Sequence, residues 1–129
     1  MIIKVGMGSK QAPSNEAANE LVQCFYCLSV SAHVAHVNTR SFAQHEALGD
    51  FYSKVIDFKD RLVEYMTGMG YINQVELEEI EAEDVMEEAE DCCYKLEEFA
   101  ASNNDEALIN MAGEFREAKG KLKFLFMLK

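Results

Sequence analysis

The chain has 129 residues, of which 49% are hydrophobic, and 23 acidic against 12 basic residues give a formal net charge of −11. This size and composition suit one globular domain and argue against a disordered chain. So acidic a surface repels phosphates, which argues against nucleic acid as a partner. No apolar run approaches the roughly 20 residues that cross a bilayer, and no signal peptide is recognisable, so we expect a cytoplasmic protein without a membrane segment.

Residues 1–12 offer little to bury and are expected to form a flexible N-terminal arm, followed by a single helical domain over residues 13–129. Pro13, Ser14, Asn15 and Glu16 are typical of a helix start. An apolar stripe at helical spacing follows, and we expect this first helix to end near Asn38 or Thr39. The stripe contains Ala18, Leu21, Phe25, Leu28, Ala32 and Ala35.

The second helix is expected to begin at once, because Ser41 and Gln44 have the spacing of a capping box. Its apolar pattern continues until Gly68 and Gly70, where the helix should end. The segment from Tyr71 to Leu77 then leads to the third helix and is long enough to cross the end of the bundle.

The apolar stripe of the third helix extends from Ala82 to Phe99, and its opposite side is acidic. Asn104 is expected to cap the fourth helix, with Asp105 and Glu106 in its first turn. Four helices of roughly 20 to 27 residues with two short joints predict an all-α fold, an antiparallel four-helix bundle.

The chemistry-bearing residues are concentrated in the first two helices. His33, His36 and His45 lie close together in the sequence, and His36 falls near the first apolar stripe. On the second helix His45 shares one half-buried sector with Tyr52, Ile56, Asp60 and Glu64. Carboxylates on such a face need a partner, and imidazole with carboxylate ligands suits iron, manganese or zinc.

A purely structural interpretation is also open. Each histidine can be an ordinary core or interface residue, and Asp60 beside Arg61 or Glu64 near Lys59 can be solvated pairs. The acidic run from Glu76 to Asp91 is typical of a solvated helix face.

The cysteines predict reduced core thiols, because no secretory signal accompanies them. They are Cys24, Cys27, Cys92 and Cys93. Cys24 and Cys27 with His33 and His36 imitate the spacing of a zinc site. All four belong to one predicted helix and point to different sectors, however, so they cannot converge tetrahedrally.

The first helical hairpin resembles a known family. The residues concerned are His33, Val34, Ala35, His36, Val37, Asn38, Phe42, His45, Glu46, Phe51, Tyr52, Asp60 and Glu64. Together they resemble the core motif of the Dps-type miniferritins of the ferritin-like superfamily. Residues 41–48 with Phe51 and Tyr52 also resemble small uncharacterised ferritin-like helical proteins encoded by tailed phages. The resemblance covers roughly residues 20 to 68, and the spacings from His45 to Asp60 and Glu64 match the family.

The resemblance implies a ferritin-like fold and an iron-binding homo-oligomer built from dimers, with a dodecameric shell as the larger assembly. His36 or His33, with His45, would face Asp60 and Glu64 of a partner subunit across a twofold axis. The implied activity is oxidation of Fe(II) by peroxide or oxygen, for iron storage or detoxification, in a bacterial or phage-infected cell. Tyr52 would lie beside the ligands, and in such a shell the acidic run would line the cavity.

Two departures from the family leave alternatives open. Gly49 occupies the position of a usual carboxylate ligand, and the nearest acid, Asp50, lies one step round the helix. His33 keeps the family spacing to His45, whereas His36 faces the apolar stripe and is preferred for that reason. Gly49 also favours a second function, a non-catalytic bundle of phage origin with an interaction or structural role. Such a protein would hold at most a structural zinc or manganese ion.

Overall fold

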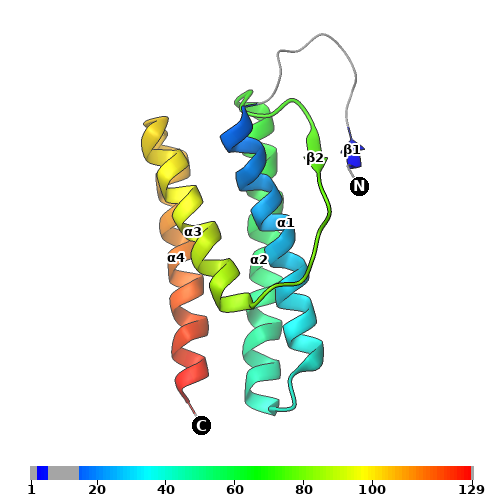
Figure 1. Ribbon diagram of the computed structural model, residues 1–129. Coiled ribbons are helices and arrows are strands. Elements are labelled where there is room, and N and C mark those ends of the chain that lie inside the picture. The colour runs from blue at the N-terminus through cyan, green and yellow to red at the C-terminus, as the bar shows by residue number, and fades with distance from the viewer. Residues whose placement is uncertain (1–2, 6–14, 129) are drawn as a thin grey trace.

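The computed structural model describes residues 3–5 and 15–128 and contains four long helices (Figure 1). They are α1 (Glu16–Asn38), α2 (Phe42–Gly68), α3 (Val85–Ser102) and α4 (Glu106–Met127). None of these described helices is long and apolar enough to cross a membrane. The four helices pack against one another, which confirms the prediction of a helical bundle.

Two short strands, absent from the prediction, accompany the helices. Strand β1 (Ile3–Val5) pairs antiparallel with β2 (Val75–Leu77), and Ile3 lies opposite Leu77. Part of the segment expected to be a flexible arm is thus hydrogen-bonded to the rest of the chain. The remainder of that arm, with Pro13 and Ser14, lies outside the described residues.

The helices form two hairpins, α1–α2 and α3–α4. Helix α1 packs against α2 and α3, and α4 packs against α3 and α2. Figure 1 shows α1 and α4 running in one direction and α2 and α3 in the other, so every packed pair is antiparallel. Helices α2 and α3 lie diagonally opposite and run parallel, so a long connection must return the chain along the bundle.

That connection, residues 69–84, follows the side of α1 instead of crossing the end of the bundle (Figure 1). Side chains of α1 hold its backbone. The Gln23 side chain accepts a hydrogen bond from the Glu78 amide at 3.0 Å, and Ser31 Oγ accepts one from the Glu83 amide at 2.8 Å. Helix α3 begins only after its cap Asp84, so the expected helix position Ala82 precedes α3, and Ala82 is exposed.

Local capping signals place three of the helix ends as predicted. Asn15 accepts a hydrogen bond from the Ala18 amide, and Ser41 accepts one from the Gln44 amide, each at 3.2 Å. Helix α2 ends at Gly68, and Gly70 adopts a φ of 81°, which favours glycine. The expected cap of α4 is wrong: Asp105 is the cap, and Asn104 adopts a φ of 50° in the preceding turn.

Asp105 does more than cap α4. Its carboxylate is buried, accepts hydrogen bonds from the hydroxyls of Tyr65 and Tyr71 at 2.8 Å, and accepts one from the Leu108 amide at 3.1 Å. This network joins the end of α2, the following turn and the start of α4. It therefore connects the two hairpins at one end of the bundle.

Phenylalanine rings fill the middle of the core. Phe115 of α4 lies 5.0 Å from Phe25 of α1, 5.4 Å from Phe58 and 6.3 Å from Phe51 of α2, measured between ring centroids. Offset and edge-on contacts at these separations are favourable for aromatic rings. Phe115 thus joins three of the four helices.

Candidate functional site on the outer face of the first hairpin

His36 and His45 form a stacked pair where α1 and α2 approach their connecting turn. Their ring centroids are 3.9 Å apart, and the ring planes differ by 18°. His36 Nδ1 lies 2.8 Å from the carbonyl oxygen of His45, and His45 Nδ1 lies 2.8 Å from the carbonyl oxygen of His36. A carbonyl only accepts hydrogen bonds, so both Nδ1 atoms carry a proton and donate it.

This arrangement determines which nitrogen can bind a ligand. In the neutral form of each ring the Nδ1 proton leaves the lone pair on Nε2. Metal-binding histidines characteristically donate their other N–H to a carbonyl or carboxylate, which holds the ring in place. Both half-buried rings therefore have the orienting contact that a metal-ligating imidazole needs.

Gly49 makes room for this pair. A Cβ atom added at Gly49 would lie 2.9 Å from Cε1 and 3.3 Å from Nδ1 of His36. Contacts below 3.0 Å force one of the groups to move, and the His36 ring is held by its hydrogen bond to His45. Glycine at the position of the expected carboxylate ligand thus has a structural reason.

This contact can be tested with Gly49→Ala. An alanine in a helix interior normally gains about 1 kcal/mol over glycine. At position 49 we expect the displaced His36 ring to reverse that gain and lower the free energy of unfolding by about 1 kcal/mol. Urea denaturation followed by circular dichroism measures the difference.

A matched control lies on α4, where Gly113 has nothing within 4 Å of an added Cβ atom. Gly113→Ala should therefore stabilise the protein by about 0.5–1 kcal/mol. In a His36→Ala background, Gly49→Ala should again raise the free energy of unfolding, because the ring that it would displace is gone. If Gly49→Ala and Gly113→Ala stabilised the protein equally, the position of the His36 ring would not require a glycine at position 49.

Further along the hairpin, His33 lies against Tyr52, with ring centroids 4.8 Å apart. Beyond them the Lys59 ammonium lies 4.2 Å from the centre of the Tyr26 ring. His33 is exposed, and Tyr52 is half-buried between the helices. Both histidine alternatives of α1 therefore contact a ring of α2: His36 stacks on His45, and His33 lies against Tyr52.

The predicted carboxylates lie farther along α2. Asp60 and Glu64 are exposed in the single chain, not half-buried as expected. A hydrogen bond with Asp60 and the negative charge of Asp60 raise the pKa of Glu64. The two acids are thus close neighbours. Arg61, an expected partner of Asp60, instead forms an ion pair with Glu114 at 3.0 Å.

Asp50 does not replace the carboxylate that Gly49 lacks. Its side chain lies 3.1 Å from Lys54 and 3.6 Å from Lys121 of α4. Burial alone would raise the pKa of Asp50, but the two ammonium groups lower it. Asp50 is therefore a surface ion-pair partner on the side of α2 that faces α4.

Within one chain the predicted ligands do not form a single site. Over residues 15–128 the only group of three potential ligands with mutually close atoms is Cys24, Glu88 and Cys92. Sequence reasoning missed this group because Cys24 and Cys92 belong to different hairpins. The available signal was the four-residue spacing of Glu88 and Cys92, which places both on one face of α3.

A scan against models of known protein families, a search of curated proteins and a search of solved structures each find no match to this chain.

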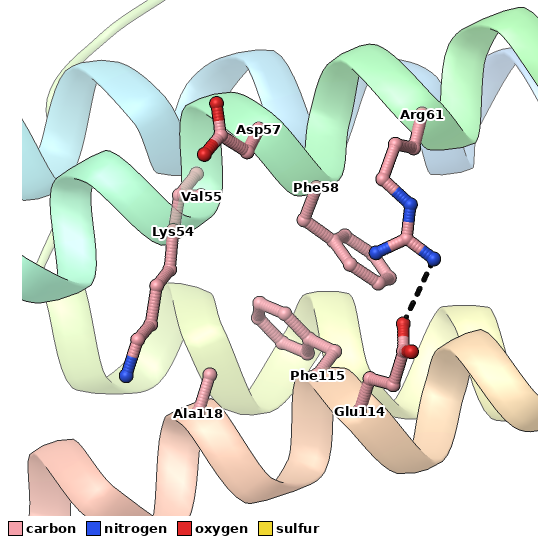
Figure 2. A pocket seen from close by; sticks show the side chains of 8 residues that line it. All are labelled: Lys54, Val55, Asp57, Phe58, Arg61, Glu114, Phe115 and Ala118. Atoms are coloured by element: carbon pink, nitrogen blue, oxygen red, sulfur yellow. Dashed lines mark hydrogen bonds and ion pairs between the residues drawn. The ribbon is translucent and has the colours of Figure 1, made fainter.

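An open cleft of about 210 Å³ lies between α2 and α4 (Figure 2). The rings of Phe58 and Phe115 meet at its base, and the Arg61–Glu114 ion pair spans one end. No group of three metal-binding side chains lies among the residues that line it. We therefore regard it as a feature of the packing between the two helices.

Proposed function

We propose that the protein is a subunit of a ferritin-like, Dps-like homo-oligomer that binds iron between two copies of the chain and oxidises Fe(II) for storage or detoxification. The observation that carries this proposal is the His36–His45 pair. Two adjacent imidazoles have their Nδ1 protons engaged by carbonyls and their Nε2 atoms left for a ligand.

The connectivity of the bundle supports a ferritin-like relationship. Bundles of this class have one long crossover between two hairpins. Here residues 69–84 make such a crossover, and α2 and α3 run parallel (Figure 1).

The positions of the ligands favour a site shared between subunits. His45 and Asp60 are separated by 15 residues of one continuous helix, about 22 Å along its axis. One chain therefore cannot bring them to one ion. A twofold axis passing near Ser53, midway along this span, would place the histidine pair of one copy opposite Asp60 and Glu64 of the other.

The surface around this axis suits contact with a second copy. Val30, Val34 and Val37 are exposed on α1 beside His33. Burial of these side chains would contribute favourable free energy to association. Exposed carboxylates at one end and histidines at the other also provide the complementary groups that a twofold contact pairs with each other.

The ligand chemistry fits iron as a substrate. Imidazole and carboxylate groups without thiolate suit Fe(II), and also zinc or manganese. In this proposal Nε2 atoms of the histidines and oxygens of Asp60 and Glu64 bind the cation. The carbonyls of residues 36 and 45 hold the ring orientation, and Tyr52 packs on His33 at the edge of the site. Bound iron supplies the electrons that reduce peroxide or oxygen.

A non-catalytic bundle is the second candidate, and Gly49 favours it. That position holds no carboxylate, and Asp50 is engaged by two lysines. Fewer acidic ligands leave a weaker site, which would suit a structural zinc or manganese ion or no ion at all. A parent protein that does not oxidise Fe(II), and that is purified with zinc, with manganese or without metal, would support this candidate.

Subunit complementation tests the shared site. We would combine His36→Ala with His45→Ala in one variant, and Asp60→Asn with Glu64→Gln in another. Each variant alone should lose at least tenfold in Fe(II) oxidation rate, because every site lacks half of its ligands. After unfolding and refolding as an equal mixture, half of the dimers are mixed and hold one intact site. About a quarter of the parent activity should therefore return.

The exposed acid Asp57 of the same helix provides the control, since Asp57→Asn should leave oxidation unchanged. Light scattering after size-exclusion chromatography would establish that all variants assemble. Activity that stays absent in the mixture would contradict a site shared between copies. A parent protein that binds no Fe(II) would contradict the proposed function as a whole.

A further inference from the structure

A second cluster of potential ligands lies on the other side of α1, where α1 packs against α3. Cys24 Sγ is 2.7 Å from Cys92 Sγ and 3.4 Å from Glu88 Oε1. The two cysteines are buried, with 4% and 0% of their surface exposed, and Glu88 is half-buried. No residue of the proposed iron site takes part.

We propose that Cys24, Glu88 and Cys92 form a binding site for a thiophilic divalent cation, with zinc as the best-fitting ion. Thiolates and carboxylates are both ligand types that zinc accepts, and zinc prefers four ligands in a tetrahedron. The histidine and carboxylate set on the outer face shares no residue with this cluster, so this inference does not depend on the proposed function.

The distances fit such an ion after a small movement. With zinc–sulfur bonds of about 2.3 Å and zinc–oxygen bonds of about 2.1 Å, a tetrahedral site separates sulfur and oxygen by about 3.6 Å and two sulfurs by about 3.8 Å. Cys24 and Glu88 are already near that separation. Cys24 and Cys92 would move apart by about 1 Å, which rotation of their side chains can supply.

The fourth ligand position has a candidate in the same place. Asp91 Oδ2 lies 3.6 Å from Cys24 Sγ and also pairs with Lys95 at 2.9 Å. Asp91 is exposed, so either its carboxylate or a water molecule can complete the tetrahedron. The site therefore lies at the rim of the core and remains reachable from solvent.

An ion at this position would connect the two hairpins. Cys24 belongs to α1, whereas Glu88 and Cys92 belong to α3, and the ligands come from segments more than sixty residues apart. Because the unfolded chain does not hold these ligands together, binding would stabilise the folded state. The expected role is structural.

The experiment is a Co(II) titration of the full chain, kept reduced with a phosphine that carries no thiol. We expect one Co(II) per chain to produce thiolate-to-cobalt charge-transfer absorption, and Zn(II) to abolish it by displacement. The thermal unfolding midpoint should rise when Zn(II) is added. No charge-transfer band at millimolar Co(II) would overturn the proposal.

Single variants locate the ligands. Cys24→Ser and Cys92→Ser should each lose the band, whereas Cys93→Ser should keep it, because Cys93 is equally buried but outside the cluster. Glu88→Gln preserves size at a half-buried position and should weaken Co(II) binding at least tenfold in a fully folded protein. An unchanged band in Cys92→Ser or in Glu88→Gln would contradict the site.

Two further measurements distinguish a metal site at these thiols from metal binding at the histidines and from a redox-active cysteine pair. Removing His36 and His45 should leave the band intact, since only thiolates produce it. If mass spectrometry shows that Cys24 and Cys92 form a disulfide and the reduced protein binds neither Co(II) nor Zn(II), the pair is a redox couple and the metal site is rejected.

Discussion

Phe115→Ala should lower the free energy of unfolding by about 4 kcal/mol. Phe115 is only 2% exposed and contacts Phe25, Phe51 and Phe58. Its removal would lose aromatic contacts to α1 and α2 and extend the cleft between α2 and α4 into the core (Figure 2). Chemical denaturation measures the loss.

Phe115→Leu is the matched control, because it keeps a large apolar side chain and should cost less than half as much as alanine. Phe124→Ala supplies a second control on the same helix, since Phe124 is exposed and its removal should cost little. Similar losses for Phe115→Ala and Phe124→Ala would contradict the central position of Phe115 in the core.

Asp105→Ala should lower the free energy of unfolding by about 3 kcal/mol. Loss of a helix cap costs about 1 kcal/mol, and loss of hydrogen bonds to a charged group costs about 2 kcal/mol more. The variant would leave the hydroxyls of Tyr65 and Tyr71 without the acceptor they share. Asp105→Asn is the control, because an asparagine can still cap α4 and accept from one hydroxyl.

The effect of Asp105→Ala should depend on pH. Burial would raise the pKa of Asp105, but the Leu108 amide and the hydroxyls of Tyr71 and Tyr65 lower it below its usual value. Its stabilising contribution is therefore present above the unfolded pKa of about 3.9 and is lost as pH falls below that value. If the difference in free energy of unfolding between the parent and Asp105→Ala stayed constant down to pH 2, this network would be contradicted.

Tyr71 limits the stabilising contribution of the Asp105 network at alkaline pH. The hydrogen bond to Asp105, followed by burial and the charges of Asp105 and Tyr65, raises the pKa of Tyr71 to about 12. Its contribution is complete below the unfolded pKa of about 10 and is lost as pH rises towards 12. The difference between the parent and Asp105→Ala should therefore also shrink above pH 10.

The candidate sites show how far sequence reasoning extends. The side-by-side placement of His36 and His45 follows from a short turn between two helices, so their spacing was a usable signal. The role of Gly49 was not visible in the sequence, because it depends on where the His36 ring lies. The pairing of Cys24 with Cys92 was also invisible, since helical periodicity specifies a face of a helix but not the partner of that face.

By itself the sequence determined the four helices, most of their ends and the all-helical class. These features follow from interactions within a few residues: the caps at Asn15 and Ser41, the glycine at position 70 and apolar side chains at helical spacing. Such interactions restrict the backbone locally, so a local pattern is enough to recognise them.

Only the tertiary structure decided how the hairpins meet. Asn104 and Asp105 are both suitable caps, but only Asp105 also accepts hydrogen bonds from Tyr65 of α2 and Tyr71 of the connection that follows α2. In the same way the path of residues 69–84 beside α1 makes α2 and α3 parallel (Figure 1). The packing of α3 against α1 then brings Cys24 to Glu88 and Cys92. These outcomes depend on contacts between distant segments, whose energies no local pattern encodes.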